Sequence, residues 1–277
     1  MIEIQDIRFG YDRKKAKVFD HFSLRLEPGR IYGLLGQNGM GKSTLLYLLT
    51  GVLFPEEGRI LVDGMDTRKR KVEMLQQTYI VPEAFELPKM RFMDYVKTYS
   101  PFYPAFSMEV LEGCMAEFQL PLTCNIHNLS MGEKKKVLMS FALATGTRYL
   151  LMDEPTNGLD VPSKRQFRKV IASNMTDGRT IVIATHQLHD VEQLIDHVLS
   201  LKDSQLRLDR SVTALSEQYG FGLLPAGVPD ADIVYAERAV QGDTGIWLRQ
   251  PDEEETPVEL EILFNATIQN NLKQSER

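Results

Sequence analysis

A glycine-rich loop between a short apolar strand and a helix constrains this chain more than any other feature. The apolar run IYGLL at residues 31–35 leads directly into GQNGMGKST at residues 36–44, and leucines with helical spacing follow within residues 42–49. The loop fits the template Gly-x-x-x-x-Gly-Lys-Ser, and the strand and helix flank it as that template requires. An α/β fold with a phosphate-binding loop at the end of a strand is therefore predicted.

The residue types of this loop suit phosphate binding. Its glycines allow the backbone to wrap so that N–H groups point at a β-phosphate, and the positive end of the following helix adds to the attraction. Lys42 is expected to reach the β- and γ-phosphates, and the hydroxyl of Ser43 to ligate Mg²⁺. The predicted nucleotide contacts of the loop are Gly36, Asn38, Gly39, Gly41, Lys42, Ser43 and Thr44. The alternative is a chance glycine-rich turn, against which the flanking strand and helix argue.

Two adjacent carboxylates and a histidine follow later apolar runs. Asp153 and Glu154 come directly after LLM at residues 150–152, and His186 ends the run TIVIATH. Ligands of open α/β sheets gather at the carboxyl ends of strands, so one carboxylate can face a metal and the other an attacking water. His186 is a candidate contact of the γ-phosphate. Alone, each of these features is common in a structural role, and the phosphate loop favours the functional interpretation.

The order of the expected elements indicates an α/β unit with an insertion and a tail. Strands are expected at residues 1–9, 18–26, 31–35, 59–62, 149–152 and 180–184. The last two are short, apolar and preceded by helix-like sequence, as in a parallel sheet covered by helices. Aromatic residues, methionines and prolines with helical spacing crowd residues 82–128 and indicate an inserted helical subdomain. After residue 204, a hairpin with a Gly-Asp turn and an amphipathic helix at 258–269 are expected.

Composition and charge narrow the function classes. The net charge of −6 argues against a general nucleic-acid binder, which needs a basic face, without excluding a local basic patch. Cys114 and Cys124 lack Cys-x-x-Cys spacing, so we expect two packing residues and neither a disulfide framework nor a zinc site. The first residues lack a signal-peptide pattern, and no apolar stretch reaches the ~20 residues of a membrane helix. A membrane role would therefore need a partner chain.

The order and spacing of the motifs resemble those of the ATP-binding-cassette ATPases over residues 1–202. LSMGE at residues 129–133 stands where that family has LSGGQ, and residues 150–154 match its Walker B strand and catalytic glutamate. NGLD at residues 157–160 matches the D-loop, and His186 matches the switch histidine. The resemblance implies that Tyr11 stacks on adenine. It also implies that Ser130 and Gly132 meet the γ-phosphate held by a second cassette, with Asp160 among the nucleotide-binding residues.

The resemblance further implies a fold and a division of the chain. The fold would be a P-loop NTPase core with a mixed sheet flanked by helices, an N-terminal antiparallel β subdomain, an inserted helical subdomain and a small α+β C-terminal extension. The ATPase domain would span residues 1–204, with the helical subdomain at about 82–146. Residues 205–277 would form the extension, which is loosely similar to the tails of exporter cassettes. Its residues Leu260, Leu263 and Phe264 share one helical face and are expected to pack.

Three residues depart from the family pattern. Met131 and Glu133 replace Gly and Gln of the signature, where a methionine crowds the approach of phosphate and a carboxylate repels it unless it points away. Glu83 stands after YIVP in place of a glutamine, and it is a predicted ligand of Mg²⁺ or water beside Ser43 and Asp153. We expect ATPase activity to survive with a changed rate or metal dependence.

The leading hypothesis is the ATP-hydrolysing subunit of an ATP-binding-cassette transporter, with ATP and Mg²⁺ bound. The predicted catalytic residues are Lys42, Glu154 and His186. The expected partners are a separate transmembrane permease and a second, identical ATPase subunit on the cytoplasmic face of the membrane, and the tail favours export. No nucleic-acid partner is expected. Two alternatives stay open: a nucleotide-binding regulator that hydrolyses weakly, and a soluble cassette protein acting on nucleic acid or ribosomes.

Overall fold

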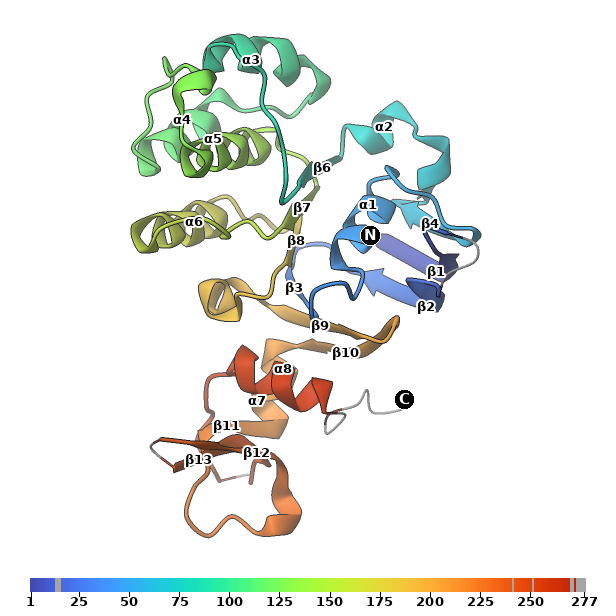
Figure 1. Cartoon of the computed structure of the whole chain (residues 1–277), viewed down its shortest axis with the longest axis vertical. Helices are drawn as coiled ribbons and strands as arrows, with labels where there is room; N and C mark the ends of the chain where they lie inside the picture. The colour runs from blue at the N-terminus through green and yellow to red at the C-terminus, as the bar shows by residue number, and fades with distance from the viewer. Residues whose placement is uncertain (13–15, 241, 251, 270–271, 273–277) are drawn as a thin grey trace.

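Two β-sheets with one helix between them form the centre of the molecule (Figure 1). The computed structural model describes residues 1–12, 16–240, 242–250, 252–269 and 272. Its strands are β1 (Ile2–Phe9), β2 (Phe19–Leu26), β3 (Ile31–Leu35), β4 (Glu57–Val62), β5 (Met65–Asp66), β6 (Thr78–Val81), β7 (Tyr149–Asp153), β8 (Thr180–Ala184), β9 (His197–Lys202), β10 (Gln205–Ser211), β11 (Tyr219–Leu223), β12 (Ile233–Ala239) and β13 (Gly242–Leu248). Its α-helices are α1 (Lys42–Leu49), α2 (Val72–Leu75), α3 (Phe92–Tyr99), α4 (Met108–Glu117), α5 (Met131–Ala144), α6 (Val161–Ser173), α7 (Val212–Gln218) and α8 (Leu260–Ile268).

The larger sheet has the strand order β10-β9-β3-β8-β7-β6. β6, β7, β8, β3 and β9 are parallel, and β10 adds to β9 as an antiparallel edge strand. The sheet is therefore mixed, as predicted. Because parallel strands point the same way, the loops after β3, β6, β7 and β8 all leave at one edge of the sheet.

Both faces of this sheet are buried, which explains the continuous apolar runs of its strands. Leu150 and Met152 of β7 pack on the side of α6, together with Phe167. Tyr149 and Leu151 of the same strand point to the opposite side, where α1 lies. The alternation of side chains along each strand thus builds two hydrophobic cores from one sheet.

A second, antiparallel sheet covers the other side of α1. Its strand order is β2-β1-β4-β5, and it shares a core with the leucines of α1. The predicted N-terminal antiparallel β subdomain is confirmed. Helix α1 is therefore enclosed between two sheets, which fixes where the loop before it lies.

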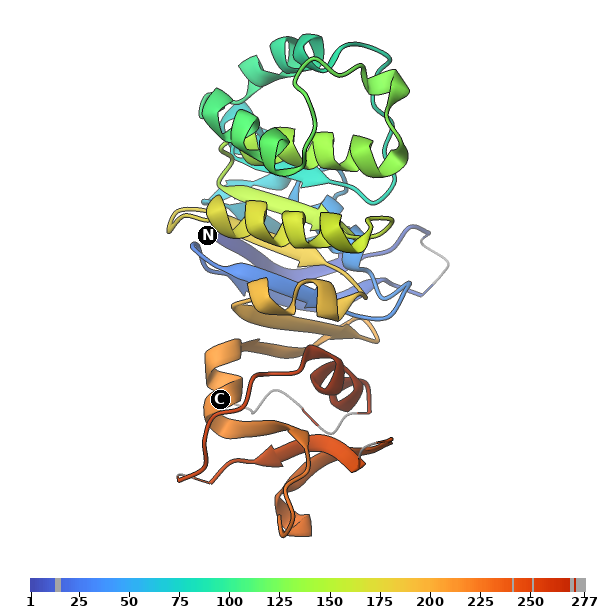
Figure 2. The ribbon, with the colours of Figure 1, turned by 90° about the vertical axis from the view of Figure 1, so that its left-hand side faces the viewer.

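The helical segment projects from the carboxyl-end side of β6 and returns to β7 (Figure 1). Helices α3, α4 and α5 enclose their own core of aromatic residues, centred on Phe141 of α5. The predicted insertion is confirmed as helical, and α5 leads from this core back to the main sheet. Figure 2 shows this helical layer and the C-terminal part at opposite ends of the molecule.

The C-terminal part consists of α7, a three-stranded sheet of order β11-β13-β12, and α8. The expected hairpin is present, but Gly242 and Asp243 belong to β13 and pair with β12, so the chain reverses before the predicted Gly-Asp turn. In α8, Leu260 and Leu263 are buried and Phe264 is half-buried. The main sheet also extends past residue 204, because β10 starts at Gln205.

Cys114 is a packing residue, as predicted. Cys114 is buried in the main core, and burial raises its pKa to about 11, which suits a packing residue. Both cysteines are free thiols in the structure. Among the described residues, no helix combines the length and apolar character needed to cross a membrane.

Candidate nucleotide-binding and hydrolysis site

The glycine-rich loop follows β3 and ends where α1 starts, as predicted. Gly41 is the N-cap of α1 at φ 95°, and a Cβ there would lie 2.8 Å from Cγ1 of Val18. Gly39 also has a positive φ, of 83°. These positions suit glycine because other residues are strained in this region of backbone space. The first N–H groups of α1, which lack partners within the helix, therefore face the loop.

Lys42 lies inside this loop. Its ammonium donates a 2.6 Å hydrogen bond to the carbonyl of Gly36, and the side chain is buried. Burial lowers the pKa of Lys42, and the carboxylates of Glu154, Asp153 and Glu83 oppose that shift. A buried ammonium aimed at its own loop is placed to neutralise phosphate charge there.

Tyr11 borders the start of α1 from the side of the antiparallel sheet. Its hydroxyl lies 3.0 Å from Oγ1 of Thr44, and its ring contacts Phe9 edge-on. The ring is 68% exposed. A large exposed aromatic ring beside a phosphate loop is available for stacking on a base.

Asp153 and Ser43 meet at the carboxyl end of β7. The Ser43 hydroxyl lies close enough to favour the charged form of the Asp153 carboxylate, whose Oδ1 is buried without a partner among the described residues. Burial raises the pKa of Asp153, and the charges of Glu154 and Glu83 raise it further. An unpartnered carboxylate oxygen beside a hydroxyl fits Mg²⁺, which takes few protein ligands and keeps waters or phosphate oxygens.

Glu83 lies near Lys42 and Asp153, whose pKa values its charge raises, and it also contacts the D-loop. It follows β6, and its Oε1 accepts a 3.0 Å hydrogen bond from Nδ2 of Asn157. Among the described residues, no group of three His, Cys, Asp or Glu side chains is arranged to hold a metal ion. Mg²⁺ in nucleotide sites generally takes one or two protein ligands and completes its shell with phosphate and water oxygens.

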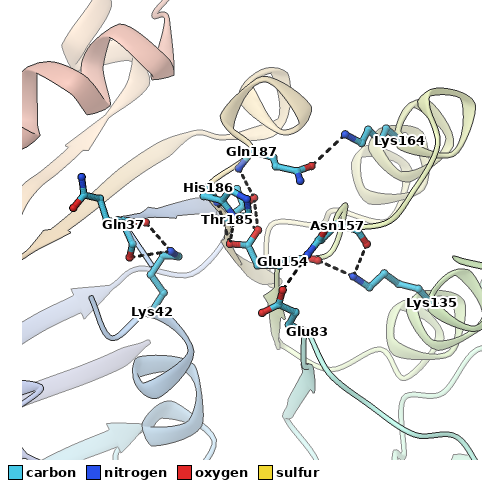
Figure 3. Close-up of polar contacts among 11 residues, drawn as sticks. Gln37, Lys42, Glu83, Lys135, Glu154, Asn157, Lys164, Thr185, His186 and Gln187 are labelled. Atoms are coloured by element: carbon cyan, nitrogen blue, oxygen red, sulfur yellow. Dashed lines mark hydrogen bonds and ion pairs between the residues drawn. The ribbon is translucent and has the colours of Figure 1, made fainter. Parts of the chain in front are cut away.

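Glu154 is the most tightly held carboxylate of the site (Figure 3). Its Oε1 accepts 2.7 Å and 3.1 Å hydrogen bonds from Nδ1 and the backbone N–H of His186, and Oε2 accepts a 2.9 Å bond from the Thr185 hydroxyl. Its backbone has a left-handed φ of 45°, an uncommon and strained conformation for glutamate. The carboxylate is therefore fixed by the two residues that follow β8, at the same sheet edge as the phosphate loop.

The signature segment forms the start of α5. Ser130 is the N-cap, its Oγ accepts from the backbone N–H of Glu133, and its own N–H donates to Oε2 of Glu133 at 2.8 Å. The Glu133 carboxylate therefore turns back onto the backbone in a capping box. These hydrogen bonds lower the pKa of Glu133. Met131 is 63% exposed beside it.

Ser130, Gly132 and Asp160 lie apart from the phosphate loop of the same chain. Asp160 caps α6 through a 2.9 Å bond from the Ser163 N–H. The side chain and the backbone of Ser163 together lower the pKa of that carboxyl. A Cβ on Gly132 would lie 3.6 Å from the Gly158 carbonyl, so the signature and the D-loop are neighbours. In the part of the chain that the structure describes, no hydrogen bond joins them to residues 36–44. The predicted site residues thus form two groups on one chain.

Sequence reasoning did not single out Lys135 and Thr185, which contact Glu154. Lys135 is buried, and its ammonium donates to the carbonyls of Glu154 and Asn157. It lies within a run of three lysines, which is typical of a solvated helix face. Helical spacing could have predicted the burial of Lys135, because it places this residue on the same face as Leu138, Met139 and Ala142 of the buried core.

Comparisons with known proteins agree with this geometry. A family model described as ABC transporter matches residues 19–157, half of the chain. A putative ABC transporter ATP-binding protein of Pyrococcus horikoshii is 32% identical over 235 residues, covering 80% of this chain and 89% of the relative. The SkfA peptide export ATP-binding protein SkfE of Bacillus subtilis is 29% identical over 225 residues, covering 79% and 92%.

A solved structure shows the likeness of the fold. It is a dimeric ATP-binding cassette in a post-hydrolysis state with ADP and phosphate, and it aligns with a TM-score of 0.66 at 22% identity. The alignment covers 76% of this chain and 98% of that one.

Proposed function

The chain belongs to the ABC transporter family as one of its ATPases, and we propose that it drives export through a separate transmembrane subunit as one half of a homodimer. The observation that carries this proposal is the meeting of the phosphate loop and a rigidly held Glu154 at one sheet edge. The signature group, Ser130, lies elsewhere on the same chain. A chain with two separate half-sites is complete only beside a second copy.

ATP binding is assigned to the loop and the start of α1. The N–H groups of residues 36–44 and the helix end would hold the phosphates, with Lys42 on the β- and γ-phosphates. Lys42 would leave the Gly36 carbonyl for phosphate at small cost, since both are hydrogen-bond acceptors within reach of one flexible side chain. Tyr11 would stack on the adenine through its exposed ring.

Hydrolysis is assigned to Glu154 and His186. The carboxylate would accept a hydrogen bond from the attacking water and align it with the γ-phosphorus, so that the bond to the ADP oxygen breaks as the new P–O bond forms. His186 donates to Oε1 through Nδ1, which keeps that oxygen in place and turns Nε2 away from the carboxylate. The Nε2 side is then available to a γ-phosphate oxygen.

Mg²⁺ would be held by the Ser43 hydroxyl, with Asp153 beside it directly or through water. When bound, this ion supplies positive charge that stabilises the phosphate oxygens during transfer. It would also neutralise the buried Asp153 carboxylate. Glu83 would join this group through Oε2, because only its Oε1 accepts the hydrogen bond from Asn157.

The second half of each site would come from the other subunit. Ser130 caps a fourteen-residue helix whose N-terminal end is solvent-exposed, and Gly132 leaves the backbone near it open. These groups would meet the γ-phosphate held by the partner, with Asp160 nearby at the start of α6. Closure over two ATP molecules and reopening after hydrolysis would then move the helical layer against its membrane partner.

The proposed export direction and membrane location are supported by the names of similar proteins. SkfE is named for peptide export, and this chain covers 92% of it. We place the chain on the cytoplasmic face of the membrane, bound to its permease. Co-purification tests this: a polytopic membrane protein should be recovered with the tagged chain, whereas recovery with ribosomes or DNA instead would contradict it.

The direct test of the hydrolytic assignment is Glu154→Gln. Loss of the carboxylate should lower the ATPase rate by about 10²–10⁴-fold, the usual contribution of a general base. ATP binding should persist, so the variant should elute as an ATP-dependent dimer in size-exclusion chromatography. Glu117→Gln, which loses only an exposed ion pair with Lys169, is the matched control and should keep the wild-type rate. Equal rates for Glu154→Gln and wild type would refute the assignment.

A further inference from the structure

Lys135 is a buried lysine that joins the signature helix to the catalytic loop. It lies one turn into α5, and its residue is 5% exposed. Its Nζ donates a 2.8 Å hydrogen bond to the carbonyl of Glu154 and a 2.9 Å bond to the carbonyl of Asn157 (Figure 3). Burying an ammonium is costly unless it is well paired, so these two bonds hold α5 against the loop after β7.

These bonds act on the residue whose carboxylate is best placed to activate water. Glu154 has a left-handed φ of 45°, which its surroundings must enforce. Its backbone N–H donates to the carbonyl of Ala184 at 2.8 Å, and its carbonyl accepts from Lys135. Both peptide groups of Glu154 are therefore fixed from outside. The orientation of the carboxylate toward Thr185 and His186 depends on that peptide geometry.

The same contact extends to the loop that enters the helical segment. Asn157 accepts from Lys135 through its carbonyl and donates through its side chain to Glu83, the residue two positions after β6. Burial lowers the pKa of Lys135, while the carboxylates of Glu83, Glu154 and Asp153 favour its charged form. One ammonium thus links α5, the D-loop and the segment after β6.

We propose that Lys135 is a positioning residue that holds the Glu154 backbone and transmits movement of the signature helix to the hydrolytic carboxylate. This inference rests on the proposed function. Ser130 and Lys135 lie one turn apart on α5, so a partner's nucleotide bound at Ser130 would shift the helix that carries Lys135. ATP bound at the partner's site would in this way change the position of Glu154 in this chain.

The test combines Lys135→Met with a matched control. Methionine has a similar length and no charge, so the two carbonyls lose their donor while the packing volume is nearly kept. The maximal ATPase rate should fall about tenfold to a hundredfold, as for a misplaced catalytic group, with half-saturating ATP within about twofold of wild type. Lys169→Met, on the exposed face of α6, removes the same charge and should keep the wild-type rate.

A second measurement separates positioning from structural support. In the Glu154→Gln background, Lys135→Met should still form the ATP-dependent dimer at an unchanged ATP concentration. Loss of that dimer, or a Lys135→Met rate within twofold of wild type, would overturn the inference. Lys135→Gln, which keeps a donor, should give an intermediate rate. If neither variant folds, Lys135 is a structural brace and the inference fails.

Different results would contradict the proposed function and the role of Lys135. A folded wild-type chain that hydrolyses no ATP with Mg²⁺ and forms no dimer as Glu154→Gln would contradict the function itself. A wild type that hydrolyses ATP, with Lys135→Met equally active, would contradict only the role of Lys135.

Discussion

Asp153 is a buried aspartate, and its burial disfavours the ionised form of the carboxylate. A free aspartate has a pKa of about 3.9, and in this fold burial raises the pKa of Asp153 above its ordinary value. Between those two pKa values the folded chain keeps a proton that the unfolded chain has released. The free energy of unfolding therefore falls as the pH rises through that window. Above the pKa of the folded state, the full destabilisation by this residue is present.

Asp153→Asn should therefore stabilise the metal-free protein at neutral pH. The melting temperature should rise by about 2 °C or more at pH 7, and the gain should shrink as the pH falls toward 4. Asp160→Asn is the control of opposite sign, because hydrogen bonds from Ser163 lower the pKa of Asp160. Its effect at neutral pH should be a loss that also shrinks in acid. Differential scanning fluorimetry in EDTA measures both, and a destabilised Asp153→Asn would contradict this account.

Glu133 sets the charge at the tip of the signature helix. Its carboxylate completes the capping box, which glutamine can also do, but it adds a negative charge where the partner's phosphate would approach. In the Glu154→Gln background, Glu133→Gln should lower the ATP concentration for dimer formation about two- to fivefold. Glu109→Gln, in the first turn of α4, is the matched control. An unchanged or higher ATP requirement for Glu133→Gln would show that the carboxylate does not repel phosphate.

Residue types and spacing predicted most of the candidate site, because phosphate and metal chemistry demands particular side chains at particular strand ends. They did not predict side-chain direction. The hydrogen bond between Glu83 and Asn157 was not predicted, because the partner of a loop side chain depends on the folded backbone. Lys135 was missed because lysines in a run usually remain solvated, and its burial depends on α5 packing against the loop after β7.

At the scale of elements, one guanidinium joins two helices to the main sheet. Arg179 precedes β8 and is 7% exposed. It donates hydrogen bonds of 2.9–3.1 Å to three carbonyls. Leu143 lies at the carboxyl end of α5, Thr147 between α5 and β7, and Asn174 at the carboxyl end of α6. Helix ends leave carbonyls without helical partners, so this fork satisfies groups that would otherwise be buried unpaired.

Arg179→Met should lower the free energy of unfolding by about 3 kcal/mol or more, since three buried carbonyls lose their donor. Urea titration followed by circular dichroism measures the change. Arg25→Met, which breaks an exposed ion pair with Glu27, should stay within about 0.5 kcal/mol of wild type. A loss below about 1 kcal/mol for Arg179→Met would mean that water replaces the guanidinium.

Elements with strong periodicity or a required motif were predictable, and connections were less so. The bounds of β3, α1 and β8 follow from an apolar run, a glycine loop and a second apolar run. The turn of the C-terminal hairpin was misplaced because Gly and Asp also fit inside a strand next to a reversal, as Gly242 and Asp243 do. Pairing between strands distant in sequence, such as β3 with β8 and β9, depends on contacts that no local pattern encodes.

Across the whole molecule, the C-terminal part shares its core with the ATPase sheet. Leu260 and Leu263 of α8 belong to the same buried cluster as Ile31 and Val198 of the main sheet. The N–H of Leu260 donates to Oε1 of Glu192 at 2.7 Å, and the ammonium of Lys202 donates to the Ile268 carbonyl. The division proposed at residue 204 therefore describes the sequence only. In the folded chain, the C-terminal part packs against the ATPase sheet.

A chain ending at residue 218 should consequently be unstable. Removing β11, β12, β13 and α8 uncovers apolar side chains beside β9 and the turns before it, and exposed apolar patches promote aggregation. In the full chain, Leu263→Ala should cost about 2–5 kcal/mol, whereas Leu223→Ala, at a 53% exposed position, should stay within about 0.5 kcal/mol. Size-exclusion chromatography and thermal unfolding test both. If the shortened chain were monomeric with an unchanged melting temperature, the ATPase core would be independent, and α8 would serve a partner rather than the fold.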